Sequence, residues 1–376
     1  MSHPIPFNKP GLAGRELEFL TTAAQSGRLA GDGPFTAQCH RILEERLGVG
    51  RVLLTTSCTH ALEMAGLLLG VSEGDEVILP SFTFVSVANA FVLRGARPVF
   101  ADIRPDTLNL DESRLESLIT PRTRAIVPVH YAGVGCAMDD IIAIANRHGV
   151  PVIEDTAHGL FGRYRSRWLG TLGALGTLSF HETKNITCGE GGALLINDPS
   201  LADRAEIIRE KGTNRSRFFR GQVDKYSWVD VGSSYLPSEL LAAFLCAQLD
   251  AADAIQARRR HIWETYRTAL APWADRRDVR LPTIPADCEQ AYHLFYLILP
   301  SWQQRRSLID HLRRHDISSV FHYLPLHLSD MGRTFGGREG DCPVTEDLSD
   351  RLLRLPLYNA MSDSDLERVV AAVSEW

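Results

Sequence analysis

Lysine is scarce in this chain of 376 residues: only four of its 40 Lys and Arg residues are lysines, at positions 9, 184, 211 and 225. A guanidinium stays protonated, so arginine cannot replace lysine where an amine must lose its proton and attack a carbonyl carbon. A GC-rich genome would produce the same scarcity. The scarcity alone therefore assigns no function, and a role for any one lysine has to be inferred from the sequence around it.

Cysteine pairs, long apolar runs and basic clusters are also missing. The seven cysteines are scattered without a Cys-x-x-Cys pair, which argues against a disulfide framework or a zinc site and favours a reducing compartment. No run approaches the ~18 apolar residues of a membrane span, and the first ten residues lack the apolar stretch of a signal peptide. The net charge is −6, with no basic stripe. We predict a cytoplasmic protein that binds neither membrane nor nucleic acid.

Short apolar strands alternate with amphipathic helices from residue 36 onward, a pattern typical of an α/β fold with a mostly parallel sheet covered on both faces. The predicted strands are 51–56, 76–79, 98–101, 125–129, 152–155, 177–180 and 192–196. The predicted helices are 37–47, 59–70, 84–94, 112–119 and 138–148.

A change of pattern after residue 250 predicts a second domain. A helical stretch at 238–270 closes a large domain of residues 1–250. The strand pattern 292–299 and the helix 303–315 predict a smaller α+β domain at 251–376. We expect about the first 15 residues to pack on this smaller domain.

Asp155 and Lys184 are the strongest candidates for catalysis. Asp155 ends the strand 152–155, and ligands of open α/β sheets bind beyond the carboxyl ends of strands. A carboxylate there can keep a pyridine nitrogen protonated, although a turn or helix-capping aspartate would look the same. Lys184 lies between two predicted strands and just before the Gly-rich stretch 187–192, so it is not on an outer helix face. The pair predicts pyridoxal phosphate (PLP) held covalently by Lys184.

A strand-to-helix junction supplies a candidate phosphate site. Ser57, Cys58 and Thr59 lie where the chain enters the helix 59–70, and the unpaired N–H groups and the dipole of a helix start favour a phosphate. Simple N-capping without a ligand would produce the same sequence. Ser179, five residues before Lys184, is a further candidate contact.

Two more side chains are candidates for the cofactor ring. Phe84 follows the strand 76–79 and is our choice to stack on the ring, the alternative being a core aromatic. His158 could bond the ring hydroxyl, although a lone histidine is more often structural.

Two other motifs carry no function on this reading. The stretch 170–176 reads G-x-x-G-x-x-G, which lacks the dinucleotide-binding spacing and follows no clear strand. His322 and His327 flank a proline and so form no helical metal-binding face. We predict no metal site.

These motifs resemble a known family over almost the whole chain. The patterns Asp155-x-Ala-His158, Ser179-Phe-x-x-x-Lys184 and Thr187-x-Gly-Glu-Gly-Gly192 are similar to those of the DegT/DnrJ/EryC1/StrS family of fold type I, PLP-dependent sugar aminotransferases. Within that family the chain looks most similar to the transaminases that form dTDP-4-amino-4,6-dideoxygalactose. The stretches that carry this closer resemblance are 31–35, 80–84, 127–131, 179–184, 210–225 and 320–327.

The resemblance implies roles for the cofactor site. Lys184 would bind PLP as a Schiff base and move the proton, and Asp155 would pair with the pyridine nitrogen. Ser179 and the backbone at 57–59 would hold the phosphate, and Phe84 would stack on the ring. His158 stands where the family more usually has Gln, which keeps a donor but changes its reach.

The resemblance also implies a homodimer with active sites at the subunit interface. An Asn in a Gly-x-Asn-Tyr-Arg motif usually reaches the partner subunit's phosphate in this family. Here the motif reads Gly-Ser-Ser-Tyr-Leu at 232–236, which places Ser234 at the Asn position and Leu236 at the Arg position. The side chain of Ser234 is shorter than that of Asn and extends less far toward that phosphate.

The activity implied is transfer of an amino group from L-glutamate to the C4 ketone of a dTDP-4-keto-6-deoxyhexose, giving the galacto or the gluco amine. Lys211, Arg215 and Arg220 are suited to the nucleotide diphosphate, although each is more simply a solvated charge. We also expect His322 and Tyr323 at the substrate.

Other activities remain open at this point. They are amination at C3, a PLP-dependent sugar dehydratase, in which His takes the lysine position, and a PLP-binding regulator without turnover.

Overall fold

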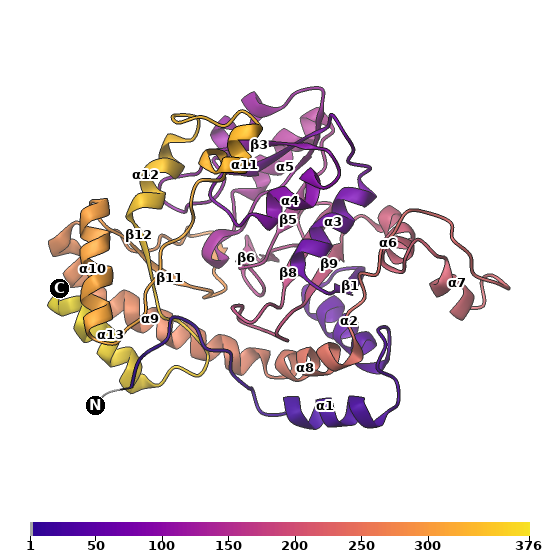
Figure 1. Ribbon diagram of the computed structural model, residues 1–376, viewed down its shortest axis with the longest axis horizontal. Coiled ribbons are helices and arrows are strands. Elements are labelled where there is room, and N and C mark those ends of the chain that lie inside the picture. Colours follow the sequence, from indigo (N-terminus) through magenta and orange to yellow (C-terminus); the bar gives the residue numbers. More distant parts are fainter. Residues whose placement is uncertain (1–2) are drawn as a thin grey trace.

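A central β-sheet organises the amino-terminal part of the chain in the computed structural model, which describes residues 3–376 (Figure 1). One part of the sheet has the strand order β1-β9-β8-β5 and the other β3-β2-β4. Parallel bridges from Ile126 to Val152 and from Val129 to Asp155 make the two parts continuous. The strands are β1 Arg51–Thr55, β2 Glu76–Pro80, β3 Arg97–Ala101, β4 Thr123–Ile126, β5 Ile153–Asp155, β8 Leu175–Ser179 and β9 Gly192–Ile196.

The sheet is mostly parallel, as the sequence pattern predicts. The pairs β2–β3, β2–β4 and β5–β8 are parallel, whereas β9 runs antiparallel to both β1 and β8. The loop 180–191 between β8 and β9 contains no crossover helix, so the chain returns beside β8 in the opposite direction. This loop carries Lys184 at the edge of the sheet where the parallel strands end.

Helices cover both faces of the sheet because successive strand residues point to opposite sides. In β1, Leu53 packs in a core with α3 and α4, while Val52 and Leu54 pack in another core with α2 and α8. The helices of this part are α2 Pro34–Leu47, α3 Cys58–Leu68, α4 Ser86–Val92, α5 Met138–His148, α6 Ala202–Arg209 and α8 Glu239–Asp250. The predicted α-helix at 112–119 is instead a 3-10 helix, η1, at Glu112–Leu118.

The predicted helical stretch 238–270 is two helices, since α8 and α9 (Ala252–Arg277) meet at a bend of 64°. Ala252 and Ile255 of α9 pack in the core below α8, whereas Ile262 packs in a separate carboxyl-terminal core. Helix α9 therefore contributes to the core below α8 and to the carboxyl-terminal core. We propose that the large domain ends near residue 250, where α9 begins. Among residues 3–376 no single helix is long and apolar enough to cross a membrane; α8 and α9 meet that criterion only as a bent pair.

The carboxyl-terminal core is built on a two-stranded antiparallel sheet of β11 and β12. Ile5 lies in this core, 0% exposed, and bridges to Ile317. The same core contains the buried face of α13, and the amino-terminal segment runs beside that helix (Figure 1). The elements here are β11 Phe295–Ile298, α10 Trp302–Arg314, η4 Leu326–Leu328, α11 Asp330–Thr334, α12 Pro343–Arg351, β12 Leu352–Leu355 and α13 Asp363–Glu375.

The remaining elements are peripheral. Helix α1 lies along α8, and α7 projects from the body of the molecule (Figure 1). Their bounds, with those of the short strands and 3-10 helices, are α1 Glu16–Gln25, η2 Tyr131–Gly133, β6 Arg163–Tyr164, β7 Arg167–Trp168, η3 Pro199–Leu201, α7 Arg215–Phe219 and β10 Cys288–Glu289.

Candidate active site

Asp155 and Lys184 lie together at the carboxyl edge of the sheet. Asp155 is the last residue of β5 and is 4% exposed; its Oδ1 accepts a hydrogen bond from the Ala157 N–H at 2.9 Å. Lys184 lies in the loop after β8, in a turn closed by its own N–H to the carbonyl of His181 at 2.9 Å. The two side chains are close enough for their charges to interact.

Burial opposes the charged form of both groups. It lowers the pKa of the Lys184 ammonium, and the Asp155 carboxylate works against this. It raises the pKa of Asp155, against the Ala157 N–H and the charge of Lys184. Solvent still reaches part of Lys184, but its amine is more readily deprotonated than that of an exposed lysine. A neutral amine is the form that attacks a carbonyl carbon.

The neighbour of Lys184 ties this loop to the carboxyl-terminal part of the chain. The Asn185 amide donates to the carbonyl of Ala291 at 2.7 Å, and its Oδ1 is 2.9 Å from His293 Nδ1. The Asn359 amide donates to the Asn185 carbonyl at 3.0 Å. These bonds fix the backbone next to Lys184 against the carboxyl-terminal part of the chain.

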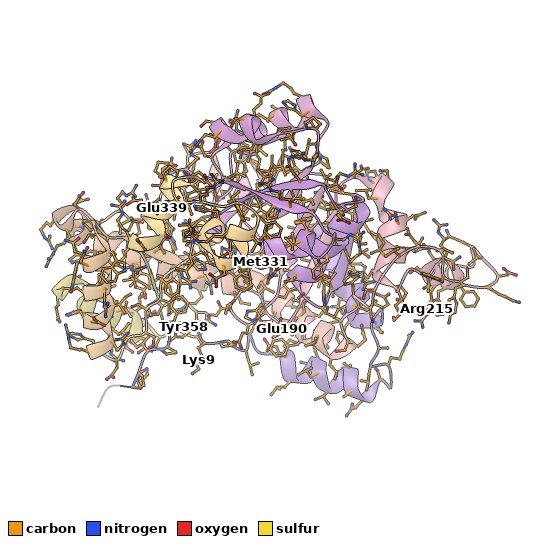
Figure 2. The ribbon with its side chains drawn as sticks, turned by 45° about the horizontal axis from the view of Figure 1, so that its top comes forward. Lys9, Glu190, Arg215, Met331, Glu339 and Tyr358 are labelled. Atoms are coloured by element: carbon orange, nitrogen blue, oxygen red, sulfur yellow. The ribbon has the colours of Figure 1, made fainter. Side chains whose placement is uncertain are left out.

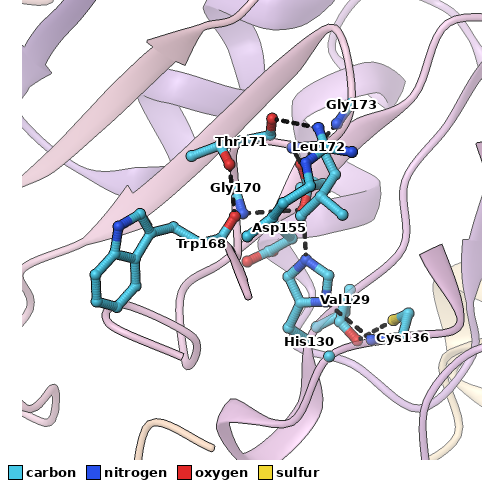
Figure 3. A network of polar contacts seen from close by, with 12 residues as sticks. Val129, His130, Cys136, Asp155, Trp168, Gly170, Thr171, Leu172 and Gly173 are labelled. Atoms are coloured by element: carbon cyan, nitrogen blue, oxygen red, sulfur yellow. Dashed lines mark hydrogen bonds and ion pairs between the residues drawn. The ribbon is translucent and has the colours of Figure 1, made fainter. Parts of the chain in front are cut away.

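A buried carboxylate supports β5 one residue before Asp155. Glu154 is 0% exposed and lies 2.8 Å from His130 Nε2. Its oxygens also accept from the N–H groups of Gly170 at 2.9 Å, Leu172 at 2.6 Å and Gly173 at 2.7 Å. Figure 3 shows His130 and these three residues gathered in one network beside Asp155.

This network also explains the motif at 170–176. The backbone of the glycine-rich stretch wraps the Glu154 carboxylate. At Gly176, a Cβ would lie 2.2 Å from the Gly170 carbonyl, so the close approach requires glycine. Glu154 was not among the predicted site residues, because the sequence does not show that the distant backbone of 170–173 surrounds it.

The candidate phosphate site lies where β9 meets α3. Ser57 is the N-cap of α3 and its Oγ accepts from the His60 N–H at 3.1 Å. Thr59 donates from its Oγ1 to Ser86 Oγ at 2.9 Å, at the start of α4. A Cβ on Gly192 would lie 2.3 Å from the Ser57 carbonyl carbon, so the strand passes this helix end as only glycine allows.

Two further predicted contacts border the same region. Cys58 interacts electrostatically with both Asp155 and Lys184, and burial raises the pKa of its thiol. Ser179 ends β8 and is 8% exposed; its Oγ is 3.5 Å from the His181 N–H.

Phe84 is 58% exposed, so the alternative of a core aromatic does not hold. The core position is taken by Phe82, which is 1% exposed and packs against Tyr131 and Tyr323 at ring-centroid distances of 5.2 and 5.6 Å.

Three histidines stack beside Lys184: His158 follows β5, and the other two come from the carboxyl-terminal part of the chain. His158 lies between His293, at 4.2 Å between ring centroids, and His322, at 6.0 Å. Tyr323 Oη is 3.5 Å from His158 Nε2, and Tyr131 Oη is 3.0 Å from His322 Nδ1.

Burial lowers the pKa of His158 far below its usual value, with a smaller contribution from the charge of Lys184, so its ring is neutral near pH 7. His158 Nδ1 is buried without a partner.

The cationic residues expected at the nucleotide do not reach this site within one chain. Lys211, Arg215 and Arg220 are exposed and pair with Glu210 or Glu206 beside them. Figure 2 shows Arg215 on the projecting segment, away from Glu190 in the loop of Lys184. Ser234 is also exposed and bridges to Glu210.

Several residues of the site were missed by the sequence analysis. Tyr131 lay inside a motif used for the family resemblance, and a signal was therefore present. His293 has no local signal. Arg354 interrupts the apolar run 352–357, which is the kind of signal that marks a charge facing a site.

The sequence matches the profile of the DegT/DnrJ/EryC1/StrS aminotransferase family over residues 11–374. This chain is a member of that family. The spore coat polysaccharide biosynthesis protein SpsC of Bacillus subtilis (strain 168) is 35% identical over 382 aligned positions, covering 100% of this chain and 97% of SpsC.

Solved structures of aminotransferases share the fold. TlmJ, an aminotransferase from Streptoalloteichus hindustanus, is 33% identical with a TM-score of 0.91, covering 99% of this chain and 98% of TlmJ. Spr1654 from Streptococcus pneumoniae, assigned as a sugar aminotransferase and solved in a PLP form, is 25% identical with a TM-score of 0.91, covering 99% of each chain. The α/β fold predicted from the sequence is confirmed.

As a DegT-family member, this protein is a PLP-dependent aminotransferase. Its residues fit the cofactor. Lys184 has a lowered pKa beside the buried Asp155, His158 Nδ1 is buried without a partner, and the end of α3 passes close to Gly192. Among residues 3–376 no cluster of His, Cys, Asp and Glu has the arrangement of a metal site.

Proposed function

We propose that this enzyme transfers the amino group of L-glutamate to the C4 ketone of a dTDP-4-keto-6-deoxyhexose, giving a dTDP-4-amino-4,6-dideoxyhexose. The observation that carries amino transfer is Lys184, buried enough for its pKa to fall and interacting with Asp155 at the edge of the sheet. The nucleotide sugar is supported by the assignment of Spr1654 as a sugar aminotransferase and by the resemblance of stretches such as 179–184 and 320–327.

In this proposal the cofactor is held by residues from several strands and helices. Asp155 would bind the ring nitrogen, Phe84 would cover the ring, and His158 Nδ1 would bond the ring hydroxyl. Ser179 and the N–H groups at 57–59 hold the phosphate. When bound, PLP supplies the electron sink for the reaction.

Lys184 has two tasks in the proposed mechanism. Its Nζ holds the cofactor between turnovers, which requires the neutral amine favoured by burial. Once released, Nζ accepts a proton from the α-carbon of the donor in one half-reaction and delivers a proton to C4 of the sugar in the other. Asp155 has to be ionised to keep the ring nitrogen protonated, and a cationic ring would offset the effect of burial on its pKa.

A homodimer is part of the proposal. The projecting arm, defined here as residues 211–231, exposes large apolar side chains: Phe219 is 70% exposed and Trp228 is 79% exposed. Such patches are typical of surfaces that bind protein. We propose that the arm packs on a second copy and brings Lys211, Arg215 and Arg220, with Ser234 beside it, toward the partner's site.

The dimer is tested by sedimentation. Trp228→Ser is expected to shift the protein from dimer toward monomer, because the buried contact is lost. Trp302→Ser, which changes a tryptophan 41% exposed on α10, is the matched control. A Trp228→Ser protein that stays dimeric at the lowest measurable concentration contradicts the proposed contact.

The activity is tested first by spectroscopy and then by product analysis. The holoenzyme is expected to lose its visible cofactor band on addition of L-glutamate and to regain it on addition of dTDP-4-keto-6-deoxyglucose. NMR of the product then locates the amine and its configuration at C4. A band that persists with every amino donor contradicts amino transfer, whereas an amine at C3 contradicts only the position. A cofactor band that neither L-glutamate nor the keto sugar changes would point to the regulator.

A further inference from the structure

A guanidinium without an acidic partner lies in the wall of the candidate site. Arg354 is on β12, where Leu353 and Leu355 point into the carboxyl-terminal core while Leu352 packs with Tyr131. Because side chains alternate along a strand, Arg354 points the same way as Leu352. Its register partner on β11 is Tyr296, which belongs to the same cluster as Tyr131.

The contacts of Arg354 leave its charge uncompensated. Nη2 donates to the Phe321 carbonyl at 3.3 Å, and the guanidinium lies over the ring of Phe7 at 4.6 Å. Nε is buried without a partner. Within residues 3–376 no carboxylate forms an ion pair with Arg354, and the ionisable groups that act on it are Tyr131 and Tyr323. Burial lowers the pKa of Arg354, but a guanidinium remains protonated at neutral pH.

Arg354 is also close to the reacting groups. Its positive charge contributes to the lowered pKa of Lys184, His158 and His322. Arg354 is partly buried, and a partly desolvated cation is stabilised when an anion pairs with it, so a ligand that brings an anion would complete this wall of the site. The candidate phosphate site is elsewhere, at the start of α3, and the sugar ring brings no negative charge. In the proposed function the diphosphate of the nucleotide sugar is left to Lys211, Arg215 and Arg220 of a second copy.

We propose that Arg354 anchors a carboxylate of the amino-acid donor while the donor's α-carbon lies against Lys184. The inference rests on the proposed function, because it is the amino donor that brings a carboxylate to Lys184. The planar guanidinium suits this task, since it can bind a carboxylate through two parallel N–H bonds. A carboxylate of the bound donor would then accept a hydrogen bond from Nε and neutralise the charge of the guanidinium.

The test separates the two half-reactions of the holoenzyme. Arg354→Gln is expected to raise the L-glutamate concentration for half-maximal loss of the cofactor band by about 10- to 100-fold, the effect of losing a charged hydrogen bond. Half-saturation by the keto sugar, measured on the aminated enzyme, is expected to change less than about twofold. Arg313→Gln, an exposed arginine 74% accessible on α10, is the control and leaves both values unchanged.

A second measurement does not depend on turnover. Glutarate has two carboxylates and no amine, and calorimetry is expected to detect its binding to wild-type and Arg313→Gln holoenzyme but not to Arg354→Gln. Arg354→Lys keeps the charge and loses the bidentate geometry, so its affinity for glutarate should lie between those of wild type and Arg354→Gln. It also replaces Arg354→Gln if that variant does not fold.

The outcomes distinguish this inference from the function on which it rests. Unchanged glutamate half-saturation in the Arg354 variants, or a shift confined to the sugar, overturns the carboxylate anchor and leaves amino transfer intact. A wild-type enzyme that reacts with no amino donor overturns the proposed function itself. If the Arg354 variants show weaker half-saturation by both L-glutamate and L-alanine, the anchor is supported and is assigned to the α-carboxylate. If half-saturation is weaker for L-glutamate alone, the anchor is supported and is assigned to the side-chain carboxylate.

Discussion

At the scale of single residues, the setting of Lys184 matters more than the rarity of lysine. Lys225 is also one of the four lysines but is exposed, whereas burial beside Asp155 lowers the pKa of Lys184. The local sequence predicted this pair because both residues follow recognisable apolar strands. Their electrostatic interaction is a property of the folded chain, and the roles assigned to them remain predictions.

Lys184→Arg tests whether proton loss at this position is required. Arginine keeps the positive charge but cannot provide a neutral amine, so amino transfer is expected to fall on the order of 10³-fold or more. Borohydride reduction followed by mass spectrometry should find cofactor attached to wild type and none attached to the variant. The exposed Lys9→Arg, outside the projecting arm and the candidate site, is the control and should match wild type in both measurements. A variant with the wild-type rate would disprove the assignment.

At the scale of elements, the end of β5 depends on a loop that the sequence did not connect to it. Glu154 accepts hydrogen bonds from His130 and from the backbone of 170–173, and the carbonyl of Asp155 accepts from the His130 N–H at 3.1 Å. The network therefore holds the strand end that presents Asp155. Glycines with a dinucleotide-like appearance are needed here for close backbone packing.

Glu154→Gln is expected to lower the free energy of unfolding by about 2–4 kcal/mol, because one amide oxygen cannot serve all of these buried donors. Urea unfolding of the holoenzyme gives the value. Glu190→Gln changes a side chain that is 68% exposed and should stay within about 0.5 kcal/mol of wild type. Equal stability of the two variants would show that the network contributes little.

At the scale of the whole molecule, several buried histidines make stability depend on pH. Burial lowers the pKa of His40, His158, His293 and His322 well below the value of 6.5 for a free histidine. His40 is outside the candidate site, where its Nε2 accepts from the Leu54 N–H at 2.9 Å. Below pH 6.5 the unfolded chain takes up protons that the folded chain excludes. The free energy of unfolding therefore falls as pH falls through that range.

His40→Gln isolates one of these contributions. Glutamine can still accept the Leu54 N–H but does not titrate, so the loss of stability between pH 7.0 and pH 5.5 should shrink by about 1 kcal/mol. Urea midpoints at the two pH values measure the change. His261→Gln, at a histidine 55% exposed, should leave the pH dependence as in wild type. A pH dependence that His40→Gln leaves unaltered would mean that His40 is not the proton acceptor.

The succession of strands and helices along the chain could be predicted because it depends on local patterns: apolar runs of strand length, helical periodicity and the glycines between them. Lys184, Asp155 and the Ser57–Thr59 junction could be found for the same reason, since each lies within or directly after such a pattern. The order of the strands within the sheet could not be predicted. The 3-10 character of η1 and the 64° bend between α8 and α9 could not, because both depend on packing against distant segments.

The sequence by itself determined the α/β class of this protein and the strand ends at which its chemistry lies, because hydrophobic periodicity and strand-end positions are local properties. Tertiary structure alone decided which distant side chains meet there. It stacks His158 between His293 and His322, and it directs Arg354 toward the same place with no carboxylate from residues 3–376 paired to it. The physical reason is that burial and the pairing of charges are set by which segments pack together, and no stretch of sequence records its own neighbours.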